Sequence, residues 1–213
     1  GHYGEKPRWR GRIHSAAFLV SIPAGLWLMS VADSAAARVA VGIYWLSLAG
    51  LFGTSASYHL FAHSAGAVKW MRRADHSMIF VLIAGTYTPF CLVVLPKPWG
   101  VPMLALLWTI AVAGIVMKMV RVGTDKSQAS GSWLYGVMGW IAVIALPKLV
   151  QELGWSRMAL LFAGGVIYSV GAVIMSTKKL DLRPATFGYH EVWHAMTVAA
   201  SACHFVLVAM VVR

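Results

Sequence analysis

The sequence has few charged residues, very few acidic ones and almost no cysteine. Charged residues make up 12% of the 213 residues and apolar residues 59%, against about 25% and roughly 45–50% in an ordinary soluble domain. Only seven residues are aspartate or glutamate. This composition excludes a soluble globular protein. We expect a single transmembrane domain over residues 1–213 with no room for a separate soluble domain.

The two cysteines, Cys91 and Cys203, both lie inside apolar stretches. A free cysteine in such surroundings behaves as a small hydrophobic residue. The chain therefore has neither a disulfide framework nor a cysteine-rich metal site. We also expect no cleavable signal peptide, because the first apolar stretch is long and further apolar stretches follow it.

Long apolar stretches take up most of the chain. A helix needs about 20 mostly apolar residues to cross a bilayer, and seven stretches of the sequence meet that requirement. The sequence therefore predicts an all-α bundle of seven transmembrane helices, with spans at 14–33, 38–62, 75–96, 100–120, 131–151, 156–177 and 187–212. Glycine, proline, serine and charged residues in the connections are typical of turns.

Lysine and arginine are distributed unequally between the two predicted sides of the membrane. Thirteen of the eighteen fall in the N-terminal segment and in the second, fourth and sixth connections. The positive-inside rule then predicts a cytoplasmic N-terminus and, after seven spans, a C-terminus outside. The net charge of +11 is explained by this topology and by anionic lipid headgroups, so we expect membrane lipids as partners and no nucleic acid.

Histidine is the residue type that points to chemistry. His190 and His194 are four residues apart, so on a helix their rings share one face, a spacing at which two histidines can bind one metal ion. The predicted topology brings His59, at the inner end of the second span, to the same depth. Three imidazoles with an open fourth position are typical of catalytic zinc. Alternatively, these histidines cap carbonyls or lie in the headgroup layer.

Two more polar residues are predicted at this depth. Asp75 opens the third predicted span, where a carboxylate can orient a water that zinc activates or accept its proton. Ser55 lies one turn before His59 and can hydrogen-bond a metal ligand or the water. The alternative for Ser55 is a hydroxyl bonded back to the carbonyl four residues earlier.

Five other ionisable residues compete for a role in this site. His63 can replace His59, although a headgroup contact is favoured at the end of the helix. His76 points away from Asp75's face of the helix, and Glu191 is an alternative base that lies off the shared histidine face. His14 is expected to cap or face the lipid boundary, and His204 to hydrogen-bond across helices.

These motifs, in this order, resemble the hemolysin III branch of the progestin and adipoQ receptor family, which includes the adiponectin receptors. The matching segments are 55–59, 75–89 and 190–194, together with the N-terminal segment 6–14. The resemblance covers essentially the whole chain. The short connections of this chain resemble those of a bacterial member, which implies a multi-pass protein of the bacterial plasma membrane.

The resemblance also implies a site and an activity. In the family, the residues matching His59, His190 and His194 hold zinc near the cytoplasmic leaflet, the residue matching Asp75 holds the water, and the residue matching Ser55 lies close by. The implied activity is ceramidase-like hydrolysis of lipid amides. Two other functions stay open: a sensor of membrane lipid state with structural zinc, and a hemolysin-type channel.

Overall fold

The computed structural model describes residues 7–120, 132–183 and 185–213. The described residues fold into helices and form no strand beyond one isolated bridge between Arg183 and Phe187. The helices are α1 Arg12–Val31, α2 Ala35–Phe61, α3 Ala65–Pro89, the π-helical η1 Phe90–Val94, α4 Lys97–Val120, α6 Trp133–Trp140, the 3-10 helix η2 Ile141–Ala145, α7 Leu146–Thr177 and α8 Tyr189–Val211.

Six helical stretches of the described chain are long and apolar enough to cross a membrane. They are Arg12–Val31, Ala35–Phe61, Ala65–Val94, Lys97–Val120, Trp133–Thr177 and Tyr189–Val211. Many large apolar side chains on their outer faces are exposed, among them Leu19, Leu46 and Val173. Such an apolar outer surface is solvated by lipid rather than by water. The protein is therefore an all-α, multi-pass integral membrane protein.

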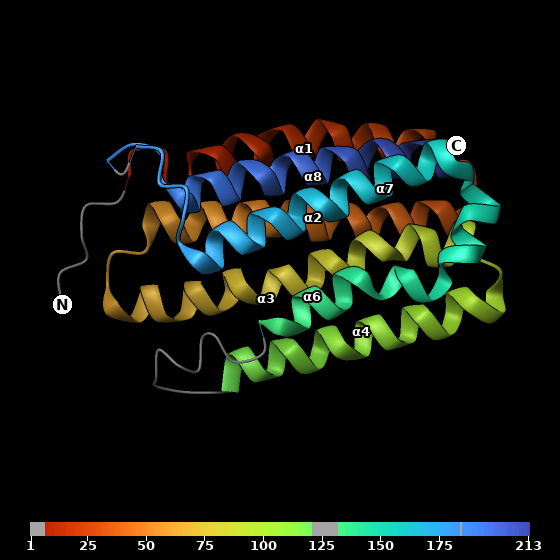
Figure 1. Ribbon diagram of the computed structural model, residues 1–213, viewed down its shortest axis with the longest axis horizontal. Helices are drawn as coiled ribbons and strands as arrows, with labels where there is room; N and C mark the ends of the chain where they lie inside the picture. The colour runs from red at the N-terminus through yellow and green to blue at the C-terminus, as the bar shows by residue number, and fades with distance from the viewer. Residues whose placement is uncertain (1–6, 121–131, 184) are drawn as a thin grey trace.

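The stretch Trp133–Thr177 covers both the fifth and the sixth predicted spans. Its 45 residues would extend about 68 Å as a straight helix, more than twice the roughly 30 Å of a bilayer core. Gly154 interrupts it with φ 73° and ψ 164°, a conformation that is essentially restricted to glycine. Figure 1 shows the labelled parts of α6 and α7 running in opposite directions on either side of this break.

Helix α3 begins ten residues before the third predicted span. The side chain of Ser64 caps it by accepting a hydrogen bond from Ala67 N at 3.1 Å. The basic residues that follow suggested a connection, but Arg73 lies on the helix and donates to Met119 O at 3.1 Å. Long basic side chains can bury their stems and keep polar contacts in this way, and Asp75 therefore lies well inside the helix.

The bundle is assembled from neighbouring helices that pack closely. Helix α2 packs against α1 and α3, α4 against α3, and α7 against α8. Gly85 allows α3 to approach α2, because a Cβ there would collide with the side chain of Ser47, as expected where small residues let membrane helices pack. The start of α1, the end of α2 and the start of α8 lie at the same end of the bundle (Figure 1).

The predicted basic connection that contains Arg121 and Lys126 lies outside the described residues, as does Lys6.

Candidate metal site

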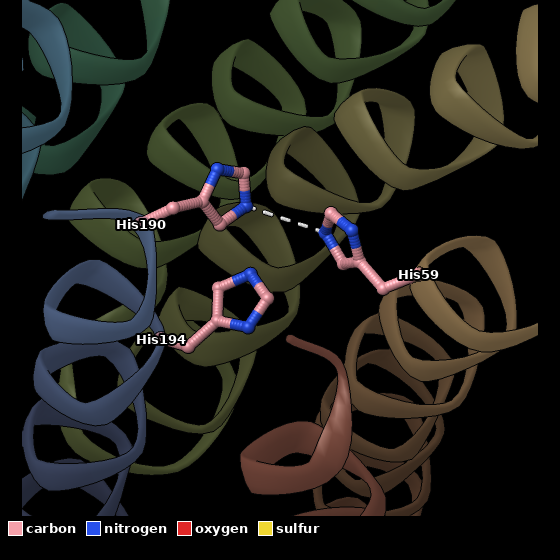
Figure 2. Close-up of side chains that lie close together, drawn as sticks. All are labelled: His59, His190 and His194. Atoms are coloured by element: carbon pink, nitrogen blue, oxygen red, sulfur yellow. Dashed lines mark hydrogen bonds between the residues drawn. The ribbon is translucent and has the colours of Figure 1, made fainter. Parts of the chain in front are cut away.

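Three histidines meet where the end of α2 lies beside the start of α8. Their ligand-capable nitrogens all lie within 4.8 Å of one another, and we call His59, His190 and His194 the three-histidine cluster. Figure 2 shows His59 pointing from α2 toward the two histidines of α8. His59 and His194 are 6% and 2% exposed, whereas His190 is only partly buried. These residues could hold a metal ion.

Local structure places each ring. His190 and His194 are one turn apart in the first two turns of α8, so the helical repeat aims both at α2. His59 lies in the last turn of α2, which ends at Phe61. The Nε2 atoms of His59 and His190 are 3.3 Å apart, and the rings of His59 and His194 have centroids 5.0 Å apart.

Ser55 and Asp75 meet each other on the neighbouring helices α2 and α3. The Ser55 hydroxyl hydrogen-bonds the Asp75 carboxyl group, and Ser55 itself is buried. Ser55 is one turn before His59 on the same helix, as predicted. Asp75 is not part of the possible metal-ligand group. Among the described residues, that group consists of the three histidines, whose ligand atoms all lie within 4.8 Å of one another.

The structure changes the expected places of two other residues. His14 does not face the lipid boundary: it is buried, and its ring stacks on His194 with centroids 3.8 Å and planes 9° apart. Glu191 is not a free base, because Arg10 Nε donates to its Oε1 atom and Gly188 N to its Oε2 atom, the latter at 2.8 Å. His14 could have been found by the depth argument applied to His59.

His63 and His204 lie as expected. His63 is exposed just beyond α2, and the Nε2 atom of His204 lies 3.3 Å from the carbonyl oxygen of Leu161 on α7. His76 accepts a hydrogen bond through its backbone carbonyl from Tyr135 at 2.8 Å. None of the three belongs to the cluster formed by the described residues.

The fold and the site together define a multi-pass helical membrane protein with a largely buried three-histidine cluster that could hold a metal ion. Comparison with known proteins identifies the family. The sequence model of the family described as "Haemolysin-III related" matches residues 3–205. The chain belongs to the haemolysin-III-related family, which confirms the resemblance seen in its motifs.

Several curated proteins are similar over most of their length. Hemolysin-3 of Bacillus cereus is 35% identical over 195 residues, which cover 90% of this chain and 85% of that protein. The Hemolysin-3 homolog of Bacillus subtilis (strain 168) is also 35% identical, with 90% and 87% covered. The human monocyte to macrophage differentiation factor is 23% identical, with 90% and 79% covered.

Proposed function

We propose that this protein is a zinc-dependent hydrolase of lipid amides, ceramidase-like in its activity, acting near the cytoplasmic leaflet. The observation that carries the proposal is the three-histidine cluster, which is largely buried at one end of a membrane bundle. Membrane lipids are the expected substrates, and they would reach the protein from the surrounding bilayer.

The donor set and its spacing support zinc. Two nitrogens bound to one tetrahedral zinc at about 2.0–2.1 Å are roughly 3.3 Å from each other, and the Nε2 atoms of His59 and His190 are 3.3 Å apart. The Nδ1 atom of His194 is buried and has no hydrogen-bond partner among the described residues. Three imidazoles are typical of catalytic zinc, whereas structural zinc usually has four protein ligands, often cysteines.

The proposed topology has seven spans with the N-terminus in the cytoplasm. The break at Gly154 and the opposite directions of α6 and α7 (Figure 1) favour two crossings within Trp133–Thr177. Arg8, Arg10 and Arg12 precede or open α1 at the end of the bundle that holds the three-histidine cluster. The positive-inside rule then assigns this end to the cytoplasmic face.

The chemistry divides among the chain's own residues. His59, His190 and His194 would hold the ion through neutral imidazole nitrogens. When bound, zinc supplies Lewis acidity that activates a water and polarises a carbonyl. Asp75, oriented by its hydrogen bond with Ser55, would take a proton from the attacking water and pass it to the amide nitrogen. The water oxygen bonds to the carbonyl carbon, the C–N bond breaks, and a carboxylate and an amine are released.

Zinc content and turnover of a labelled ceramide, measured on purified protein in lipid nanodiscs, test this mechanism. His194→Ala should lose both zinc and turnover, because a ligand is removed. Asp75→Asn should keep zinc and lose turnover by about 100-fold or more, the range for a lost general base. Both quantities are read by metal analysis and by product release from the same preparations.

His63→Ala is the matched control, since it removes an exposed histidine close to His59 without touching the cluster. It should keep wild-type zinc content and wild-type turnover. Full turnover in His194→Ala and Asp75→Asn would contradict the proposed hydrolase.

A second function is favoured by the way the cluster joins distant parts of the chain. His59 and His190 are 131 residues apart in sequence, so an ion at this point would link α2 to α8. A lipid-state sensor with structural zinc predicts that chelation lowers the melting temperature while no lipid tested is turned over.

A further inference from the structure

We propose, on the basis of the metal centre proposed above, that Arg10 and Glu191 are positioning residues. Their ion pair holds the N-terminal strap, defined as residues Pro7–Gly11, over the three-histidine cluster and fixes the metal-binding geometry of His190 and His194.

The ion pair fixes the first turn of α8. Glu191 is 0% exposed, and Arg10 donates to its Oε1 atom, while Gly188 N donates to its Oε2 atom at 2.8 Å. Both carboxylate oxygens are therefore engaged. Since Glu191 lies between His190 and His194 in sequence, contacts that hold Glu191 also hold the backbone that carries the two rings. Removing one partner of a buried ion pair leaves an uncompensated charge, which is costly.

The backbone of the strap forms a second attachment. Arg8 N donates to Ala185 O at 3.4 Å, and Trp9 N donates to Thr186 O at 3.3 Å. The segment that contains Ala185 and Thr186 leads directly into α8. The strap is thus bound both to the connection before α8 and, through Arg10, to its first turn.

The strap also contacts the histidine of α2. Gly11 has φ 84°, and a Cβ at this position would lie 2.9 Å from the Cβ atom of His59. Only glycine allows both this conformation and this approach. Beyond Gly11 the chain enters α1 and places His14 against His194. The strap therefore lies against His59, and the first turn of α1 lies against His194.

The charge of the pair also matters to a divalent cation. Arg10 carries a positive charge beside the cluster, and Glu191 compensates it. Glu191→Gln leaves that positive charge uncompensated next to the metal, whereas Arg10→Gln leaves a carboxylate in a fully buried position without its partner. Either change should disturb the cluster, by a different physical route.

The test measures zinc affinity of the full chain in nanodiscs by competition with a chromophoric chelator. Arg10→Gln and Glu191→Gln should each weaken zinc binding about 10–100-fold, the usual effect of losing a partner that orients metal ligands. The double variant should be no weaker than the worse single variant, because the two residues act as one unit. Arg10→Lys, which keeps the charge, should recover part of the loss.

Arg8→Gln is the matched control, because it removes an exposed arginine of the same strap and should leave zinc affinity unchanged. The absorption spectrum of the cobalt-substituted protein reports ligand geometry, and it should change in Arg10→Gln and Glu191→Gln but not in Arg8→Gln. A purely structural ion pair would lower the melting temperature and leave that spectrum unchanged.

Hydrogen exchange of the wild-type protein tests the strap without any variant. Zinc should slow exchange at the amides of Arg8 and Trp9, and equal exchange with and without zinc would overturn the proposal. Wild-type affinity and spectra in Arg10→Gln and Glu191→Gln would overturn it as well. Zinc binding without lipid turnover would overturn the hydrolase alone, whereas a wild-type protein that takes up no metal would overturn both.

Discussion

His14 is buried against His194 with the two rings parallel. In this arrangement His14 packs against the three-histidine cluster and is not oriented to be a further ligand. Two parallel rings at 3.8 Å direct their nitrogen lone pairs along parallel planes, which does not suit coordination of one ion by both. Its contribution is aromatic packing, worth roughly 0.5–1.5 kcal/mol beyond burial.

We therefore predict opposite results for two substitutions of this residue. His14→Phe should retain the stack and keep wild-type zinc content, whereas His14→Ala should leave a void and weaken zinc binding by about 10-fold. Chelator competition on both variants measures this. If His14→Phe loses zinc as completely as His194→Ala does, His14 is a ligand and the prediction is wrong.

Sequence patterns reached some residues of the site and missed others for physical reasons. The spacing of His190 and His194 is local, and His59 follows from membrane depth, so both could be predicted. The pair of Arg10 with Glu191 joins residues 181 apart and leaves no periodic signal. The contact of Ser55 with Asp75 depends on the rotation of α2 against α3, which hydropathy does not encode.

At the scale of the element, hydropathy located the helices well and their ends poorly. Helix α3 begins at Ala65, whereas the sequence predicts a span that starts near 75. The prediction is late because the basic residues between these positions are typical of a connection but lie on the helix. The break in Trp133–Thr177 was easier to predict. The expected connection between 151 and 156 contains Gly154, whose backbone conformation interrupts the helix.

Gly154→Ala should strain this break and lower the free energy of unfolding by about 1–3 kcal/mol. No neighbouring atom lies within 4 Å of a Cβ built at this position, so the whole cost comes from the backbone conformation. Unfolding by a denaturing detergent measures it.

Gly165→Ala, in the same helix, is the control. A Cβ there also meets nothing within 4 Å, but the residue is helical, so alanine should be neutral or stabilise by up to about 1 kcal/mol. Equal effects of the two substitutions would contradict the assigned role of Gly154.

At the scale of the whole molecule, the proposed topology can be tested by labelling single cysteines in intact cells. In a background with Cys91 and Cys203 replaced by alanine, a membrane-impermeant thiol reagent should label Trp155→Cys directly. It should label His63→Cys only after permeabilisation. Trp155 is 73% exposed beside the break at Gly154, and His63 is exposed at the end that holds the cluster. The reverse pattern would invert the topology.

The distance in sequence between the histidines of α2 and α8 has a consequence for biosynthesis. His59 and His190 are separated by 131 residues, which a ribosome adds in roughly 7–26 s at ordinary elongation rates. During that interval α2 has been synthesised, but it carries only one histidine of the three-histidine cluster. Arg10 has also been synthesised, but its partner Glu191 has not. A nascent chain cannot assemble the cluster before α8 has been synthesised and inserted, so any metal that the three histidines bind together can be captured only after that step.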